Sequence, residues 1–249
     1  METLESELER ARDLSVPALA DAIESIGFEC TRCGACCKAE DGCGDSQSDT
    51  DSDADSGDPH TATIFPDEIR TIQDGGDYDF RDVARPMPYG LTEGADGLEG
   101  ETFEWALQTD DCGDCTFYED GETPAEQGAC TIHENRPLVC QTYPFSVALG
   151  GTSQPMGEAV DSVALPAQQE AGGIGDEEGM VRAHECEGLG RDISREDAEE
   201  LAAALKTRAV RELEEAIAVR DGYEPTDTGR GDIVVHDSEG PKRPDGTPL

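Results

Sequence analysis

The spacing of apolar residues predicts two helices at the N-terminal end of the chain. Residues 2–13 and 15–27 both have a helical pattern. Ser15 is a residue type that caps helices, and Gly27 is suited to end the second helix. The apolar positions that recur on one face of this second stretch are Leu19, Ile23 and Ile26. We therefore expect an N-terminal helical arm over residues 1–27.

The clearest helical pattern lies near the other end of the chain, at residues 195–220. Ser194 and Asp197 are spaced as in a capping box, with Asp in place of the usual Glu. One face of this stretch is apolar and contains Leu201, Leu205, Leu213 and Ile217. Such a stripe predicts a helix that packs on the rest of the protein.

Between these helices the pattern predicts only short elements. Residues 61–65 and 102–107 suit short strands, and residues 66–72 read as the start of a helix. Residues 74–101 are rich in Gly, Asp and Pro, which favours irregular structure. Residues 41–60 contain almost nothing apolar and predict a disordered acidic insertion.

The chain is strongly acidic, with 58 acidic and 18 basic residues and a net charge of −40. A surface this acidic repels phosphates, so nucleic acid is not an expected partner. Self-repulsion opposes folding in dilute salt and is largely screened when the Debye length falls to ~3 Å in molar salt. The composition is typical of a protein from a high-salt organism; the alternative is an acidic surface for a basic partner or for cations.

The chain also lacks the apolar segments that membranes require. No stretch approaches the ~20 consecutive apolar residues of a membrane span. The N-terminal residues have neither a basic start nor an apolar core, so we expect no secretory signal and a cytoplasmic location. No membrane partner is expected, and the sequence does not identify a protein partner.

Ten cysteines are present, and four of them lie within eight residues at Cys30, Cys33, Cys36 and Cys37. Two-residue gaps let successive thiolates turn toward one point, as in zinc and iron–sulfur loops. Cys36 and Cys37 are adjacent, so both can bind one centre only where the backbone bends; otherwise one serves a second centre. Without an export signal, disulfides are disfavoured.

The thin apolar core and the cysteines together predict the fold class. We expect a small, irregular α+β domain stapled by metal, with short strands, cysteine-bearing loops and flanking helices. The expected organisation is the N-terminal arm, a cysteine-cluster metal-binding domain, a helix packed on that domain, and a flexible acidic tail, over residues 1–27, 28–193, 194–221 and 222–249.

Three later segments make the cysteine signal more specific. They are Cys115-Thr-Phe-Tyr118, Cys130 to Phe145 with Arg136-Pro137 and Tyr143-Pro144-Phe145, and Cys186-Glu-Gly-Leu-Gly190. Together with Phe28 to Cys37 they resemble the CxxCxxCC cysteine-cluster family, also called YkgJ-like, which is named for chelation of zinc or iron. The resemblance covers about residues 28–193.

The resemblance implies a set of eight metal ligands: Cys30, Cys33, Cys36, Cys37, Cys115, Cys130, Cys140 and Cys186. Cys43 and Cys112 have no counterpart in the family pattern. Arg136 is expected to hydrogen-bond a backbone carbonyl or a carboxylate near the metal. The resemblance implies no catalytic residue, and whether the protein is an enzyme stays undecided.

Two kinds of centre suit these thiolates. A 4Fe–4S iron–sulfur cluster would support a redox or methyl-transfer role, because some relatives are labelled iron–sulfur oxidoreductases and a related domain occurs in flagellin lysine-N-methylase. Zinc would instead make a closed structural site, or a metal-handling module, without catalysis. A reducing cytoplasm and the family labels favour the iron–sulfur cluster.

Overall fold

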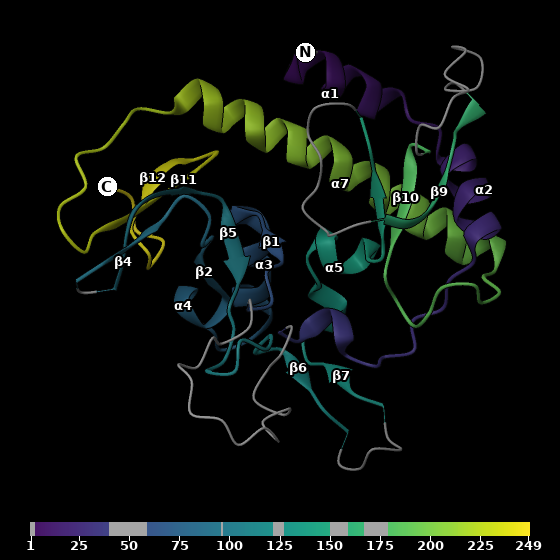
Figure 1. The fold of residues 1–249 in the computed structure, drawn as a ribbon, viewed down its shortest axis with the longest axis horizontal. Helices are drawn as coiled ribbons and strands as arrows, with labels where there is room; N and C mark the ends of the chain where they lie inside the picture. Colours follow the sequence, from purple (N-terminus) through teal and green to yellow (C-terminus); the bar gives the residue numbers. More distant parts are fainter. Residues whose placement is uncertain (1–2, 40–58, 96, 122–126, 150–158, 167–178) are drawn as a thin grey trace, which may run out of the picture. The chain divides into compact units, whose positions relative to one another are not determined.

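The computed structural model describes residues 3–39, 59–95, 97–121, 127–149, 159–166 and 179–249 (Figure 1). The expected insertion at residues 41–60 and Cys43 therefore lie almost entirely outside the described residues. The chain forms two compact units: unit 1 contains residues 1–31 and 138–220, and unit 2 contains residues 32–137 and 221–249. Helices and several small sheets occur together, which confirms the expected α+β class.

The described part of unit 1 combines helices with a small sheet. The helices are α1 (Leu4–Asp13), α2 (Val16–Ile26), α5 (Leu138–Thr142) and α7 (Arg195–Gly222). The strands are β8 (Phe145–Val147), β9 (Ala159–Val163) and β10 (Val181–His184). They form an antiparallel sheet in the order β8-β10-β9.

The predicted helix ends in unit 1 are confirmed. The Ser15 hydroxyl accepts a hydrogen bond from the Ala18 N–H and caps α2. Gly27 ends α2 with a φ of 80°, and a β-carbon there would lie 2.5 Å from the Arg191 carbonyl oxygen. The Ser194 hydroxyl accepts a hydrogen bond from the Asp197 N–H at the start of α7, as the capping-box spacing predicts.

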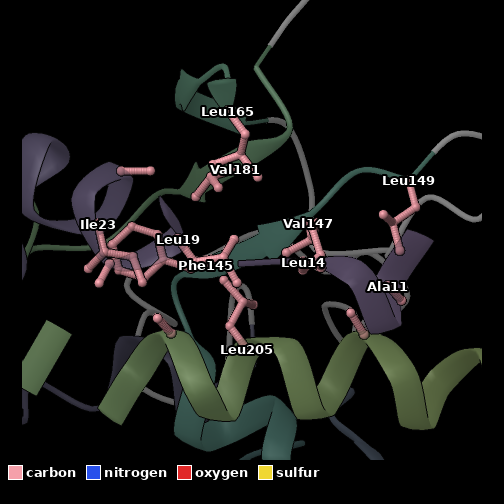
Figure 2. Packing of buried hydrophobic residues seen from close by; sticks show 14 of the residues in the cluster. Ala11, Leu14, Leu19, Ile23, Phe145, Val147, Leu149, Leu165, Val181 and Leu205 are labelled. Carbon is pink, nitrogen blue, oxygen red and sulfur yellow. The ribbon is translucent and has the colours of Figure 1, made fainter. Parts of the chain in front are cut away.

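The core of unit 1 lies between its helices and its sheet (Figure 2). Leu19 and Ile23 of α2, Phe145 of β8 and Leu205 of α7 are fully buried, and Leu205 points toward Phe145 in Figure 2. Of the apolar stripe predicted on α7, Leu205 and Leu213 are buried and Leu201 and Ile217 are partly buried against the same cluster. The stripe therefore packs into the core of its own unit.

Unit 2 is built from short elements and three small sheets. Its helical segments are η1 (Ala35–Cys37), α3 (Pro66–Gly75), α4 (Phe80–Val83) and η2 (His133–Asn135). Its strands are β1 (Thr63–Ile64), β2 (Ala84–Pro86), β3 (Thr92–Gly94), β4 (Gly97–Phe103), β5 (Trp105–Leu107), β6 (Tyr118–Glu119), β7 (Ala129–Cys130), β11 (Ile233–Asp237) and β12 (Gly240–Lys242). The sheet orders are β1-β5-β2, β12-β11-β4-β3 and β6-β7.

The strand predicted at residues 102–107 is divided between two sheets. Glu104 has a φ of 72°, and its N–H donates to the His236 carbonyl. This bend ends β4 at Phe103 and starts β5 at Trp105, which pairs with β1 and β2. The region at 74–101, expected to be irregular, contains α4, β2 and β3 and most of β4.

Residues 222–249, expected as a flexible tail, are folded into unit 2. Strand β11 pairs in parallel with β4 on one side and antiparallel with β12 on the other. Val234, Val235 and His236 of β11 are buried. The short apolar run at 233–235 is thus a central strand, because β4 supplies its partner from a distant part of the chain.

Among the helices that the structure describes, none combines the length and the apolar character needed to span a membrane.

Candidate metal centre

The loop at residues 33–37 places two cysteine side chains next to each other. Gly34 has a left-handed φ of 78° and starts η1, and the Cys37 N–H donates to the Gly34 carbonyl at 2.7 Å. This tight turn supplies the backbone bend that adjacent cysteines need to face one point. The sulfur atoms of Cys36 and Cys37 lie 3.9 Å apart.

Two further cysteines approach this loop through backbone hydrogen bonds. The Cys115 N–H donates to the Cys37 carbonyl at 2.8 Å. Cys130 lies in β7, where it pairs with Tyr118 of β6, three residues after Cys115. The backbone therefore fixes Cys115 relative to both Cys37 and Cys130.

Electrostatic interactions show that four thiols of unit 2 lie close together. Burial, with smaller effects of the nearby Cys130 and Cys36 thiolates, raises the pKa of Cys115 to about 11. Burial also raises the pKa of Cys130, and Cys36 adds to that shift. A hydrogen bond from Cys37 lowers the pKa of Cys36 to about 7, and Arg136 contributes in the same direction. We call Cys36, Cys37, Cys115 and Cys130 the four-thiol cluster.

Arg136 supplies positive charge beside this cluster. Its guanidinium acts on both Cys36 and Cys130 and lowers the pKa of each thiol. Its Nε donates to the His133 carbonyl at 3.2 Å, which is the kind of backbone contact expected from the sequence. A cation at this position stabilises thiolates, the form of cysteine that binds metals.

The fifth family cysteine of unit 2, Cys33, is exposed and precedes Gly34 in the same loop. Its thiol and that of Cys37 both act electrostatically on the Tyr118 hydroxyl. Cys33 therefore lies beside the four-thiol cluster.

The other three family cysteines belong to unit 1, on segments that contact one another. Cys30 follows Glu29, whose N–H donates to the Gly188 carbonyl at 3.0 Å. Gly188 in turn donates to the Cys186 sulfur at 3.4 Å, so the Cys30 and Cys186 segments run side by side. The Tyr143 hydroxyl, three residues after Cys140, donates to the Glu185 carbonyl next to Cys186.

Helix α5, which carries Cys140, is held by a buried arginine of α7. The Arg208 guanidinium donates to the Thr142 hydroxyl at 3.0 Å and to the Phe145 carbonyl at 3.4 Å. The Thr142 hydroxyl donates to the Leu138 carbonyl within α5. The position of Cys140 thus depends on an ion-pairing residue more than sixty positions away in the sequence.

The chemistry of the four-thiol cluster suits a soft metal, because all of its donors are sulfur. Within the described ranges, no three Cys, His, Asp or Glu side chains converge closely enough to hold a metal ion as they stand. Cys36 is exposed. The donor set therefore fits zinc or iron, and closure around the metal needs side-chain rotation.

Cys112, which lies outside the family pattern, differs from the eight family cysteines. Cys112 is disulfide-bonded, although the sequence argued against disulfides. The eight family cysteines are all thiols. The assignment of these eight thiols as metal ligands stays a prediction.

Sequence reasoning missed Tyr118, whose ring lies against both cysteine-bearing segments of the cluster. Its position in Cys115-Thr-Phe-Tyr118 was part of the family resemblance, but nothing in the local pattern distinguished it from a core aromatic residue. The sequence feature that could have pointed to Tyr118 is the presence of glycine at positions 34 and 128, because the Tyr118 ring lies against both.

Comparison with known proteins gives one family match. A family model described as CxxCxxCC, putative zinc- or iron-chelating domain, matches residues 29–187, which include all eight cysteines discussed above. Neither the curated proteins nor the solved structures gave a match to this chain. Because the family model covers more than half of the sequence, the chain belongs to the CxxCxxCC family of putative zinc- or iron-chelating domains.

Proposed function

We propose that this protein binds a single zinc ion through the four-thiol cluster of unit 2. The observation that supports this most directly is the 3.9 Å separation of the Cys36 and Cys37 sulfurs. In a tetrahedral site with Zn–S bonds of about 2.3 Å, each pair of sulfurs lies about 3.8 Å apart. This pair is therefore already spaced for one four-coordinate ion.

Four thiolates around zinc leave no open position for a water molecule, so the site is structural in type. Its free energy of binding adds to the free energy of folding. This free energy matters for unit 2, because short strands and small sheets make up much of it. In this proposal the protein is a zinc-stapled or metal-handling module, and Cys36, Cys37, Cys115 and Cys130 are the ligands.

A 4Fe–4S iron–sulfur cluster is the second candidate, and the number of cysteines favours it. Cys30, Cys33, Cys140 and Cys186 exceed what one zinc ion needs. Each cysteine of such a cluster binds a different iron, so the sulfurs stand farther apart than the Cys36–Cys37 pair. A redox or methyl-transfer role belongs to this candidate. Either centre needs reduced thiols, which a cytoplasmic location would maintain.

The test is the metal and acid-labile sulfide content of protein purified without oxygen in molar salt. The variants are Cys36→Ser and Cys115→Ser, with Cys140→Ser as the matched control because Cys140 is a free thiol of unit 1, outside the four-thiol cluster. One zinc per chain, lost in both variants and kept in the control, supports the zinc site. Iron with sulfide and a brown colour supports the second candidate instead. Full metal retention in both variants, or no bound metal in the parent protein, refutes the ligand assignment.

A further inference from the structure

The ring of Tyr118 lies between two glycines that belong to different cysteine-bearing segments. A β-carbon on Gly34, in the loop between Cys33 and Cys36, would lie 2.1 Å from Tyr118 Cζ. A β-carbon on Gly128, two residues before Cys130, would lie 2.0 Å from the Tyr118 hydroxyl oxygen. Real β-carbons do not approach other atoms this closely, so the phenol ring occupies the space that both glycines leave.

The two glycines differ in what their backbone requires. Gly34 has a φ of 78°, which by itself favours glycine. Gly128 is not among the residues with positive φ, so its backbone conformation is open to other residue types. The absence of a side chain at Gly128 is therefore explained by the ring of Tyr118 alone.

The remaining contacts of Tyr118 involve the same segments. Its N–H donates to the Cys115 carbonyl at 3.0 Å, and it pairs with Cys130 across the β6-β7 ribbon. The Lys38 ammonium lies 5.5 Å from the centre of its ring and forms a two-oxygen ion pair with Asp120. Tyr118 thus touches the segment of every cysteine in the four-thiol cluster.

From these contacts we infer that Tyr118 is a positioning residue of the metal centre. The ring acts as a spacer that holds the Cys33–Cys37 loop at a fixed separation from β7. Metal ligands must be held within about 0.5 Å of their productive positions, so loss of the spacer misplaces the thiols. The whole phenol provides this function, because its Cζ is the atom nearest to the Gly34 position and its hydroxyl oxygen the atom nearest to the Gly128 position. The inference rests on metal binding at the four-thiol cluster.

The experiment compares Tyr118→Leu and Tyr118→Phe with Tyr78→Leu as the matched control. Tyr78 is a second tyrosine of unit 2; it packs on the Phe117 ring at 5.4 Å and would contact a β-carbon on Gly76. The measurements are zinc affinity by competition with a chelator, and the free energy of unfolding of the metal-free protein, both in molar salt. We expect Tyr118→Leu to weaken zinc binding by about 10–100-fold, as loss of supporting residues around metal ligands does. Tyr118→Phe keeps the ring and should lose less affinity than Tyr118→Leu, and Tyr78→Leu should keep affinity within a factor of about three.

A second pair of variants tests the spacer without relying on the folding of Tyr118→Leu. Gly128→Ala adds a methyl group against the ring, and we expect it to weaken zinc binding. The double variant Gly128→Ala with Tyr118→Leu should bind no more weakly than Tyr118→Leu alone, because the steric conflict is gone.

The outcomes separate this inference from the proposed function. A parent protein that binds no metal overturns both. A parent protein that binds zinc, with unchanged affinity in Tyr118→Leu and Gly128→Ala, overturns the role of Tyr118 alone. Equal losses of affinity in Tyr118→Leu and Tyr78→Leu also overturn it, because they indicate a general effect on stability.

Discussion

At the scale of single residues, Glu101 of β4 is a carboxylate with several hydrogen-bond partners. It accepts hydrogen bonds from the Thr226 N–H at 2.8 Å, the Thr226 hydroxyl, and the Tyr223 hydroxyl at 3.0 Å. It also pairs with His236 Nε2 at 2.9 Å. These contacts fasten the segment after α7 to the sheet of unit 2. The sequence could not single out Glu101, because 58 acidic residues look alike without their partners.

The surroundings of Glu101 predict a specific loss of stability in acid. Its pKa is lowered to about 2, first by the Thr226 hydroxyl, whereas the ordinary value is 4.5. Between these values the unfolded chain binds more protons than the folded one, so the contribution of Glu101 is present above pH 4.5 and is lost as pH falls toward 2. Glu101→Gln should cost about 1–2 kcal/mol of unfolding free energy near neutral pH, and the cost should shrink across that window.

The measurement for Glu101 is denaturant unfolding of the parent and the variant as a function of pH at constant molar salt. Glu93→Gln, on the exposed strand β3, is the control for removing one negative charge. A difference between parent and Glu101→Gln that stays constant from neutral pH to pH 2 would contradict this explanation.

At the scale of elements, helices were predictable and most strands were not. Leu19 and Ile23 in α2, and Leu201 and Leu205 in α7, lie four residues apart, as on one face of a helix. Ser15 and Gly27 mark the ends of α2, so both helices could be predicted from local sequence. Strand β4 begins Gly97-Leu-Glu-Gly and lacks alternation; it is a strand because β11, far along the chain, pairs with it. Such a partner is not visible in a local window.

The same distinction holds for the candidate site. The spacing of Cys30, Cys33, Cys36 and Cys37 predicted metal binding without any structure. The grouping of Cys36 and Cys37 with Cys115 and Cys130, and the position of Tyr118 between two glycines, depend on contacts between distant segments. The candidate ligands could therefore be named from the sequence, and their grouping could not.

Helix α7 gives a prediction that belongs to this scale, because one of its residues holds α5 in place. The Arg208 side chain is only 3% exposed and forms a 2.7 Å ion pair with Glu212 in addition to its bond to Thr142. Removing one partner of a buried ion pair leaves the other charge uncompensated. Arg208→Met should therefore lower the free energy of unfolding by about 3 kcal/mol.

Thermal or urea unfolding in molar salt measures this effect. Arg12→Met is the matched control, since Arg12 pairs with Glu214 at 2.8 Å between the same kinds of groups but is 55% exposed. An exposed pair contributes about 0–1 kcal/mol, so the control should change little. Equal effects of the two substitutions would show that burial of Arg208 does not matter for stability.

At the scale of the whole molecule, the balance between charge and core decides stability. Many of the fully buried residues of unit 1 are alanines, among them Ala11, Ala20, Ala198 and Ala202, which bury little apolar area each. Cations are so few that some serve several carboxylates at once, as Arg195 does with Asp21, Glu24 and Glu199. Most of the net charge of −40 must therefore be screened by solvent ions.

This balance predicts that salt, by screening charge, determines whether the chain is folded. Raising KCl from about 0.1 M to about 2 M shortens the Debye length from about 10 Å to below 3 Å, which removes most repulsion between exposed carboxylates. We expect circular dichroism to show a largely unfolded metal-free chain at the lower KCl concentration and a folded one at the higher.

Sucrose is the control for this experiment. It favours burial by exclusion from the protein surface without screening charge, so it should substitute only weakly for KCl. Equal thermal stability at both KCl concentrations, or full replacement of KCl by sucrose, would mean that the carboxylates do not oppose folding. If bound zinc then restores folding at low salt in the parent protein but not in Cys36→Ser, the metal supplies the stability that the acidic surface removes.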